Sequence, residues 1–291
     1  MKIFMTGGAG DLGVLLARDL EAQNDLPVRL DIRAPRNPQR GQWLHGSILD
    51  REILADAMKD CEIVIHIAAW HGIHLVKGEK NAHDFWDLNV TGTFNVFEQA
   101  AKQGINKFIY ISSTSVQDRF GIYGHTKVLG EEIARAYHER HGMNVIVLRP
   151  GAFIPYWNRD AYRSFSEWAR WYFKGAVHIS DVCQAVLKSV RKLKDAPLPE
   201  MPVLFVDGKY EYNSAHMDNW DAGGPGTTFM QVYQDFSRVA EQYQLDIAAK
   251  PEIFDIQPTQ EILAYDPSYS FLNVLQDLEK YGEAGPPLPN F

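Results

Sequence analysis

A glycine-rich turn near the start of the chain restricts its fold more than any other feature. Residues 3–5 are apolar, helical spacing begins at Leu12, and between them lies the segment Thr-Gly-Gly-Ala-Gly-Asp-Leu-Gly, residues 6–13. Glycines at positions 7, 10 and 13 let backbone N–H groups and a helix N-terminus approach a pyrophosphate, which any Cβ atom would keep away. We therefore predict a dinucleotide-binding loop; the alternative is a glycine-rich turn that binds no ligand.

An acidic residue at the end of the next predicted strand supports this prediction. Residues 28–30 have strand character, and the strand ends at Asp31, 24 residues after Gly7. A carboxylate at this place accepts hydrogen bonds from the adenosine ribose hydroxyls and repels a 2′-phosphate. Asp31 therefore favours NAD over NADP, although Arg33 and Arg36 follow closely and offer an alternative phosphate contact.

Short apolar strands alternate with helical segments through the first half of the chain. Continuous apolar strands between helices are typical of a parallel sheet that is covered on both faces. Further strands are expected at residues 63–67, 108–111, 145–148 and 203–206, and helices at 53–58, 89–101, 128–137, 182–190 and 229–243. Residues 208–226 and the tail after Tyr281 are expected to be loops.

These elements predict an α/β fold with a doubly wound parallel Rossmann sheet and a smaller, mostly helical C-terminal substrate lobe. The NAD-binding domain is expected to comprise residues 1–152 plus about 177–207. The substrate-binding lobe is expected to comprise residues 153–176 plus 208–291, where aromatic residues crowd the start.

Composition excludes several classes of protein. The net charge of −8 disfavours a nucleic-acid partner, and no apolar run approaches the roughly 18 residues that cross a bilayer. Glycines interrupt the apolar start, which is unlike a signal peptide. Two unpatterned cysteines indicate a reducing compartment or no redox role. We expect a cytoplasmic protein whose partner is a small-molecule substrate, without a metal, although His71, His74 and His83 offer a metal cluster as an alternative.

A tyrosine and a lysine spaced four residues apart supply candidate acid/base chemistry. Tyr123 and Lys127 lie on one face of a predicted helix, just after Ser112 and Ser113 at the end of a strand. A nearby ammonium, with the positive ring of an oxidised nicotinamide, favours phenolate and lowers a pKa that is normally about 10. The pair can then exchange a proton with a substrate alcohol near neutral pH.

Taken in order, these motifs resemble the extended short-chain dehydrogenase/reductases, also called the NAD-dependent epimerase/dehydratase family. The resemblance covers residues 1–190 and rests on the following segments: residues 6–13, Asp31, His66-Ile67-Ala68-Ala69, residues 89–93, residues 111–116, Tyr123-Gly124-His125-Thr126-Lys127, Leu148-Arg149-Pro150-Gly151 and residues 177–182. It implies an NAD(P)-dependent enzyme and a homodimer formed through the helices around residues 89–101 and 123–140.

The resemblance also assigns roles to matching positions. Tyr123 would be the general acid/base, Lys127 would lower its pKa and hold the nicotinamide ribose, and Ser113 would hydrogen-bond the reacting substrate oxygen. Cofactor contacts are implied at Gly7, Gly10, Asp11, Leu12, Gly13, Asp31, Ser47, Ile48, Ile67, Ala68, Ala69, Asn89, Ser112, Tyr123, Lys127 and Pro150.

Departures from the family pattern restrict the range of expected substrates and reactions. Ser113 and Tyr123 are only ten residues apart, so the turn between them must be tight and a longer substrate loop is missing. Thr114 and Ser115 replace the Asp-Glu pair of the dehydratases, and residues 174–175 lack the Arg-Asp that grips a nucleotide diphosphate. Ser47 stands where the family usually has its acidic adenine contact. Asp50, the nearby carboxylate, is expected instead to cap the helix that follows.

A compact substrate region resembles the uronate dehydrogenase branch, in which an arginine takes the substrate carboxylate. Arg163 and Arg170 are candidates, with a solvated surface arginine as the alternative. The aromatic residues after Pro150 contact the substrate, form core between the lobes or make a subunit contact; these alternatives stay open. The expected substrate-binding residues are Ser113, Thr114, Tyr156, Trp157, Arg163 and Arg170.

Three functions follow from these patterns. The first is an NAD-dependent oxidoreductase that transfers hydride to or from a secondary alcohol or ketone of a small carbohydrate-like substrate. The second is a sugar-nucleotide epimerase with retained NAD, and the third is a non-catalytic NAD(P)-sensing Rossmann protein. The joint presence of Ser113, Tyr123 and Lys127 disfavours the third, because a sensor has no need of all three.

Overall fold

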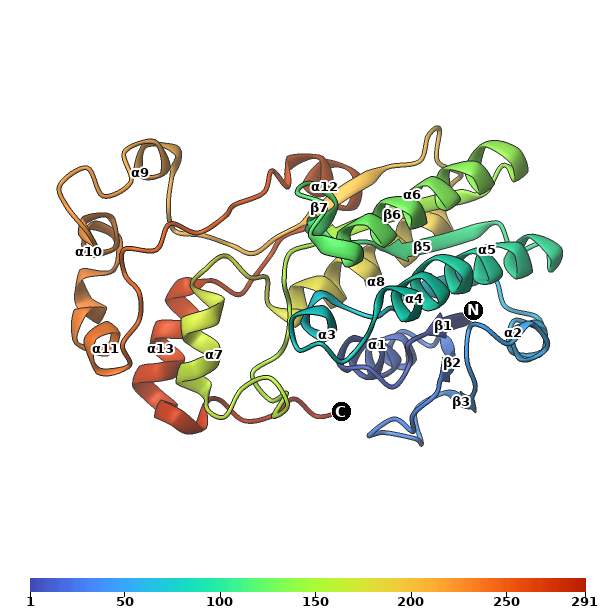
Figure 1. Ribbon diagram of the computed structural model, residues 1–291, viewed down its shortest axis with the longest axis horizontal. Coiled ribbons are helices and arrows are strands. Elements are labelled where there is room, and N and C mark those ends of the chain that lie inside the picture. Colours follow the sequence, from blue (N-terminus) through green and yellow to red (C-terminus); the bar gives the residue numbers. More distant parts are fainter.

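A seven-stranded, wholly parallel sheet forms the centre of the computed structural model, which describes residues 1–291 (Figure 1). The spatial order is β3-β2-β1-β4-β5-β6-β7, so the strand order reverses between β1 and β4. The strands are β1 (Lys2–Thr6), β2 (Leu26–Asp31), β3 (Gln42–His45), β4 (Ile63–His66), β5 (Lys107–Ile111), β6 (Asn144–Pro150) and β7 (Val203–Val206). Crevices at such a reversal are where open α/β sheets bind ligands, and the predicted Rossmann fold is confirmed.

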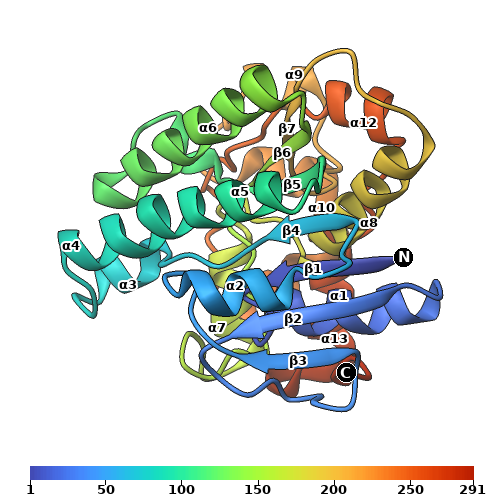
Figure 2. The same cartoon turned by 90° about the vertical axis from the view of Figure 1, so that its right-hand side faces the viewer.

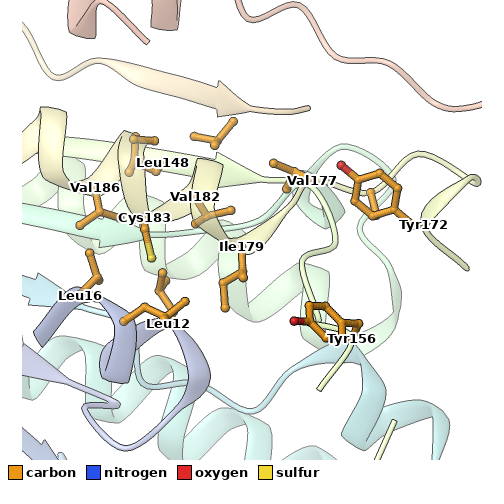
Figure 3. Packing of buried hydrophobic residues seen from close by; sticks show 14 of the residues in the cluster. Leu12, Leu16, Leu148, Tyr156, Tyr172, Val177, Ile179, Val182, Cys183 and Val186 are labelled. Carbon is orange, nitrogen blue, oxygen red and sulfur yellow. The ribbon is translucent and has the colours of Figure 1, made fainter. Parts of the chain in front are cut away.

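Helices cover both faces of the sheet (Figure 2). On one face, α1 (Asp11–Ala22) and α8 (Ile179–Asp195) pack against alternate strand residues such as Ile3 and Met5. On the other, α2 (Arg51–Ala57), α5 (Thr93–Lys102) and α6 (Gly121–His141) pack against the intervening residues such as Phe4. Because successive strand residues point to opposite faces, the central strands contribute to two cores and are mostly apolar. Figure 3 shows α1 and α8 meeting through Leu16, Cys183 and Val186.

A group of helices forms a lobe beside the carboxyl ends of the strands (Figure 1). It comprises α7 (Phe165–Tyr172), α9 (Ser214–Asp218), α10 (Thr227–Tyr233), α11 (Ser237–Gln242) and α13 (Phe271–Tyr281). One helix from the same stretch of sequence, α12 (Gln257–Leu263), instead packs against β7 and α8. The C-terminal residues therefore do not lie wholly in the lobe. None of the helices combines the length and apolar character that crossing a membrane requires.

Two helix predictions and one loop prediction need correction. The helix expected at 229–243 is divided into α10 and α11 by a 3-10 turn, because Tyr233 leaves helical backbone angles at φ −125° and ψ 34°. The loop expected at 208–226 contains α9, which begins where the Asn213 side chain accepts a hydrogen bond from the His216 N–H. The helix expected from residue 89 continues backwards through a π-helical segment, Trp86–Gly92, into α4 (Ala82–Phe85).

The buried carboxylate of Asp181 ties the lobe to the sheet domain. It lies in the first turn of α8, where its Oδ1 accepts hydrogen bonds from the Ser268 N–H (2.9 Å) and hydroxyl (3.0 Å). Its Oδ2 accepts from the Tyr269 N–H at 3.2 Å. These bonds fix the segment that leads into α13, and burying a carboxylate without them would be costly.

Replacing Asp181 with Ala should lower the free energy of unfolding by about 1–3 kcal/mol, because it leaves buried donors of Ser268 and Tyr269 without an acceptor. Urea denaturation followed by circular dichroism measures the change. Asp195→Ala, at the exposed end of the same helix, is the matched control and should leave stability unchanged. Equal stability of the two variants would contradict the anchoring role.

Candidate active site

The glycines of the first turn lie where a side chain would collide with backbone. Gly7 has a φ of +69°, and a Cβ there would be 2.9 Å from the Ala68 nitrogen at the end of the neighbouring strand. A Cβ on Gly13 would be 2.5 Å from the Gly7 carbonyl oxygen. Gly10 is the N-cap residue of α1, so Asp11, Leu12 and Gly13 present the first N–H groups of the helix. The cradle fits a pyrophosphate, because the missing Cβ atoms leave backbone donors accessible.

Asp31 ends β2 and contacts the same turn. Its carboxylate accepts hydrogen bonds from the Ala9 N–H and the Arg33 N–H, both at 3.0 Å. The Asp11 carboxylate, predicted as a cofactor contact, instead accepts from Trp157 Nε1 and Asn158 Nδ2, each at 3.1 Å. Its backbone N–H at the start of α1 is therefore the group of Asp11 that faces a cofactor phosphate most simply.

The remaining cofactor candidates follow the ends of neighbouring strands. Ser47 and Ile48 come after β3, where Asp50 caps α2 as expected by accepting from the Glu52 and Ile53 N–H groups. Pro150 ends β6 beside Val206 of β7. Because parallel strands end at one edge, these positions surround the crevice.

Thr6 joins the first turn to the loop after β4. Its hydroxyl oxygen accepts hydrogen bonds from the N–H groups of Ile67 and Ala68, both at 3.1 Å, and lies 2.6 Å from His66 Nδ1. The chain then passes through Ala69 into α3 (Gly72–Val76). The loop predicted to run beside a cofactor is thus held against the phosphate-binding turn.

Asn89 fastens this loop to α6. The π-helical segment presents its side chain, whose oxygen accepts from the Trp70 N–H at 2.8 Å. Its amide nitrogen donates to the Trp70 carbonyl and the Thr126 hydroxyl, both at 3.0 Å. Protein partners thus occupy the side chain, and a direct cofactor contact by Asn89 stays a prediction.

Ser113, Tyr123 and Lys127 gather at the carboxyl end of β5. Lys127 Nζ donates to the carbonyl oxygen of Ile111 at 2.7 Å, and Tyr123 lies one turn earlier on α6. A hydrogen bond between the Ser113 and Tyr123 side chains opposes the rise that burial causes in the Tyr123 pKa. All three side chains are buried, and their catalytic roles stay predictions.

A tight turn makes the short connection from Ser113 to Tyr123 possible. Ser113 caps a 3-10 turn, Thr114–Val116, and its hydroxyl accepts from the Ser115 N–H. Arg119 then adopts a left-handed φ of +51° before α6 begins. Gly124 is required here, because a Cβ would overlap the Ser115 carbonyl oxygen and lie 2.6 Å from the Arg119 carbonyl carbon.

Burial shifts the pKa values of the acid/base groups. It raises the pKa of Tyr123, and the hydrogen bond from Ser113 opposes the shift. Burial lowers the pKa of Lys127 to about 7, against the opposing field of Glu131. Burial, aided by the Lys127 charge, lowers the pKa of His66 to about 3, so this imidazole is neutral at physiological pH. Lys127 is therefore the acid/base group of the cluster whose pKa lies near neutrality.

The side chains expected to contact substrate differ in their surroundings. The Tyr156 hydroxyl donates to the Pro286 and Pro287 carbonyls, and its ring packs edge-on against Trp157 in the core between the lobes. Arg170 Nη1 donates to the Tyr243 carbonyl within the lobe. Thr114 and Arg163 are more open: Thr114 is half-buried in the 3-10 turn and Arg163 is exposed.

Residues 157–163 contact the start of α1 at one end and the residue after α3 further along. At one end Trp157 contacts Asp11, and further along the Asp160 carbonyl accepts from Lys77 Nζ at 3.0 Å. Lys77 follows α3, whose Gly72 lies against the Tyr123 ring. Arg163 ends this segment with an exposed side chain, and His71, His74 and His83 do not form a metal-binding group with other ligands.

Residues 3–168 match the NAD dependent epimerase/dehydratase family. The chain belongs to this family. The family predicted from the sequence is thereby confirmed.

Relatives in this family include sugar-acting enzymes. L-arabinose 1-dehydrogenase (NAD(P)(+)) of Haloferax volcanii is 26% identical over 184 residues, covering 52% of this chain and 66% of the relative. Uronate dehydrogenase of Pseudomonas putida is 25% identical over 175 residues, covering 53% and 62%. The chain thus spans less than two thirds of the length of these relatives, and 44% of an uncharacterized Sinorhizobium fredii protein.

A solved structure shares the complete fold. UDP-glucuronic acid 4-epimerase of Bacillus cereus, in complex with UDP-glucuronic acid and NAD, superposes with a TM-score of 0.70. The alignment covers 97% of this chain and 98% of that chain at 20% sequence identity. At this identity the likeness establishes the fold alone.

The motifs contain further site residues to which the sequence assigns no role. Thr6 and Thr126 lie inside the motifs, and each hydroxyl joins two segments. Glu131 follows Lys127 by four residues, the spacing that places Lys127 on the face of Tyr123. That spacing was the available signal.

Replacing Gly124 with Ala should open the turn between Ser113 and Tyr123, because the added Cβ meets backbone rather than a flexible side chain. We expect a loss of about 1–3 kcal/mol in stability and at least a tenfold fall in kcat/KM. Chemical denaturation and steady-state kinetics measure these. His125→Ala, the exposed neighbour, is the control and should behave as the unaltered protein; a Gly124→Ala variant that does the same would contradict the requirement for glycine.

Proposed function

We propose that this protein is an NAD-dependent oxidoreductase that transfers hydride to or from a secondary alcohol or ketone of a small carbohydrate-like substrate. The observation that carries the proposal is the cluster of Ser113, Tyr123 and Lys127 at the sheet edge that also carries the glycine cradle. A proton-exchanging phenol, an ammonium and a dinucleotide cradle together are suited to oxidising an alcohol.

The protein's own groups handle the proton. In the oxidising direction the Tyr123 phenolate accepts the proton of the substrate hydroxyl, while the Ser113 hydroxyl hydrogen-bonds the reacting oxygen. Lys127 stabilises the phenolate through its charge, and in reduction Tyr123 returns the proton. The bound cofactor supplies the acceptor or donor of hydride. Gly7, Gly10 and Gly13, with the first N–H groups of α1, would hold its pyrophosphate.

NAD is favoured over NADP by the position of Asp31. Its carboxylate borders the phosphate-binding turn through Ala9, where it would accept hydrogen bonds from ribose hydroxyls and repel a 2′-phosphate. Arg33 lies 3.8 Å from this carboxylate, and Arg36 lies 3.6 Å from Asp11. Both arginines thus already face acidic groups, which reduces their availability for a phosphate.

A small substrate suits the compact crevice. The tight turn after Ser113 and the short segment 157–163 leave out chain that would wrap a nucleotide. Arg163 is the better candidate of the two arginines for a substrate carboxylate, because Arg170 is engaged with Tyr243. Uronate dehydrogenase and L-arabinose 1-dehydrogenase are among the relatives, which supports a free sugar or sugar acid.

A homodimer through α5 and α6 is part of the same proposal. These helices and the π-helical segment before them expose large apolar side chains, Trp86 (49%), Phe94 (44%) and Leu129 (36%). Apolar side chains on adjoining helices of one face are suited to a contact with a second copy.

Tyr123→Phe should reduce turnover by at least about 10²-fold, because it removes the transferable proton and little else. NAD affinity, measured by fluorescence titration, should stay within about twofold. Tyr137→Phe, farther along the same helix, where the hydroxyl donates to Glu98, is the control and should retain activity. A loss of less than tenfold in Tyr123→Phe would refute the acid/base assignment.

The alternative, a sugar-nucleotide epimerase, is favoured by the structural neighbour and makes the opposite prediction for nucleotide binding. If the substrate is a free sugar, UDP added to the NAD-loaded protein should show no saturable binding by calorimetry up to millimolar concentration. The purified protein should also exchange added NAD freely, since a dehydrogenase releases it each turnover. Micromolar UDP binding that competes with turnover would establish the epimerase instead.

A further inference from the structure

A buried ion pair lies one helical turn beyond the acid/base lysine. Glu131 is 5% exposed and follows Lys127 on the inner face of α6. Arg149 of β6 donates from Nε to Glu131 Oε1 at 2.8 Å and from Nη2 to Oε2 at 2.5 Å. The Ser112 hydroxyl donates to the same Oε1 at 2.5 Å. The carboxylate is therefore fully coordinated in a bidentate arrangement.

The groups around this pair are the ones that the proposed reaction needs. Ser112 immediately precedes Ser113 and follows Ile111, whose carbonyl holds Lys127. The pair thus fixes the strand end from which two of the three acid/base residues are positioned. A bond network of this kind moves or stays as a unit.

Glu131 is the negative charge that faces Lys127. From the other packed elements, Lys127 faces Tyr110 of β5, whose ring centroid is 5.2 Å from Nζ, and His66 and His71 of β4 and its loop. Burial lowers the pKa of His66 to about 3, so its imidazole is neutral at physiological pH, and burial raises the pKa of Tyr110 far above neutrality. Tyr123 on α6 is the remaining neighbour, and Arg149 lies behind Glu131.

We propose that the Glu131–Arg149 pair is a positioning device for Lys127: Glu131 keeps the ammonium charged beside Tyr123, and Arg149 limits how strongly it does so. This inference rests on the proposed function. The three charges alternate in sign from Arg149 through Glu131 to Lys127, so removing either member changes the field at Lys127 in opposite directions. A pair too distant from Lys127 to act on it would leave the charge of Lys127 unchanged when either member is removed.

The role matters because burial alone drives Lys127 toward its neutral form. With a pKa of about 7, Lys127 is close to half charged at neutral pH even in the field of Glu131. Without Glu131 it would be mostly neutral there, and the phenolate of Tyr123 would lose its stabilising charge.

Direct titration of Lys127 tests the proposal without any substrate. The full-length protein is labelled with 13C at lysine Cε, the Lys127 signal is assigned with Lys127→Met, and its chemical shift is followed from pH 5 to 10. Glu131→Gln should lower the midpoint by at least about one pH unit, whereas Arg149→Gln should raise it. Midpoints that do not move, or that move in the same direction, would overturn the proposal.

Kinetics supply the second readout. For alcohol oxidation, the acid limb of the pH profile of kcat/KM should move to higher pH in Glu131→Gln and to lower pH in Arg149→Gln. On the acid limb, a shift of one pH unit corresponds to about a tenfold change in the fraction of Tyr123 that is ionised. If Tyr123→Phe refutes the proposed reaction, the lysine titration still decides whether the pair controls Lys127.

Loss of folding in a single variant does not remove the test. The double variant Glu131→Gln with Arg149→Gln leaves no unpaired buried charge, and it removes the nearer negative charge together with the farther positive one. A lowered Lys127 midpoint in this variant supports the proposal, and an unchanged midpoint overturns it.

Discussion

The site depends on how closely two backbones approach at the reversal of strand order. The backbone of Gly7 lies so close to Ala68 that a Cβ atom would not fit between them. The Thr6 hydroxyl holds the two segments together by accepting two hydrogen bonds from the loop after β4. Because β1 and β4 are neighbours, this contact places the phosphate-binding turn beside the loop that leads toward Tyr123. Asn89 then fastens the same loop to α6, so cradle and acid/base cluster share one support.

Polar bonds also hold the lobe against the sheet domain. The lobe is joined to the sheet domain through Asp181 and through Asp11, each carboxylate accepting hydrogen bonds from residues distant in sequence. Trp157 and Tyr156 fill the space between the domains with aromatic surface.

The electrostatics of the cluster follow from its burial. A phenol and an ammonium removed from water both shift toward their neutral forms; a hydrogen bond from Ser113 opposes the shift of Tyr123, and neighbouring charge opposes that of Lys127. The protein supplies one such charge in Glu131, restrained by Arg149. A buried pair of this kind is weak support for stability by itself, so a contribution to the site gives a better reason for its burial.

Much of this was determined by the sequence itself. Apolar strands between helices, glycines at fixed spacing, Asp31 at a strand end and the Tyr123–Lys127 spacing are local patterns, and local patterns dictate backbone turns and helix faces. The sequence also indicated the tight turn after Ser113, and the structure builds it with Arg119 and Gly124. The sequence did not indicate the boundary between α10 and α11, because the helix is interrupted at Tyr233, a residue that is buried by tertiary packing.

What only the tertiary structure decided is the partner of each polar side chain. Asp11 accepts a hydrogen bond from Trp157, which is 146 residues away in the sequence. Asn89, in the π-helical segment, accepts one from Trp70. No spacing rule predicts either hydrogen bond. Helical spacing places Glu131 on the same face of α6 as Lys127, but its partner Arg149 lies on strand β6, which no spacing within the helix can indicate. Long-range hydrogen bonds depend on how whole elements pack, whereas glycine turns and helix faces depend on the nearest few residues.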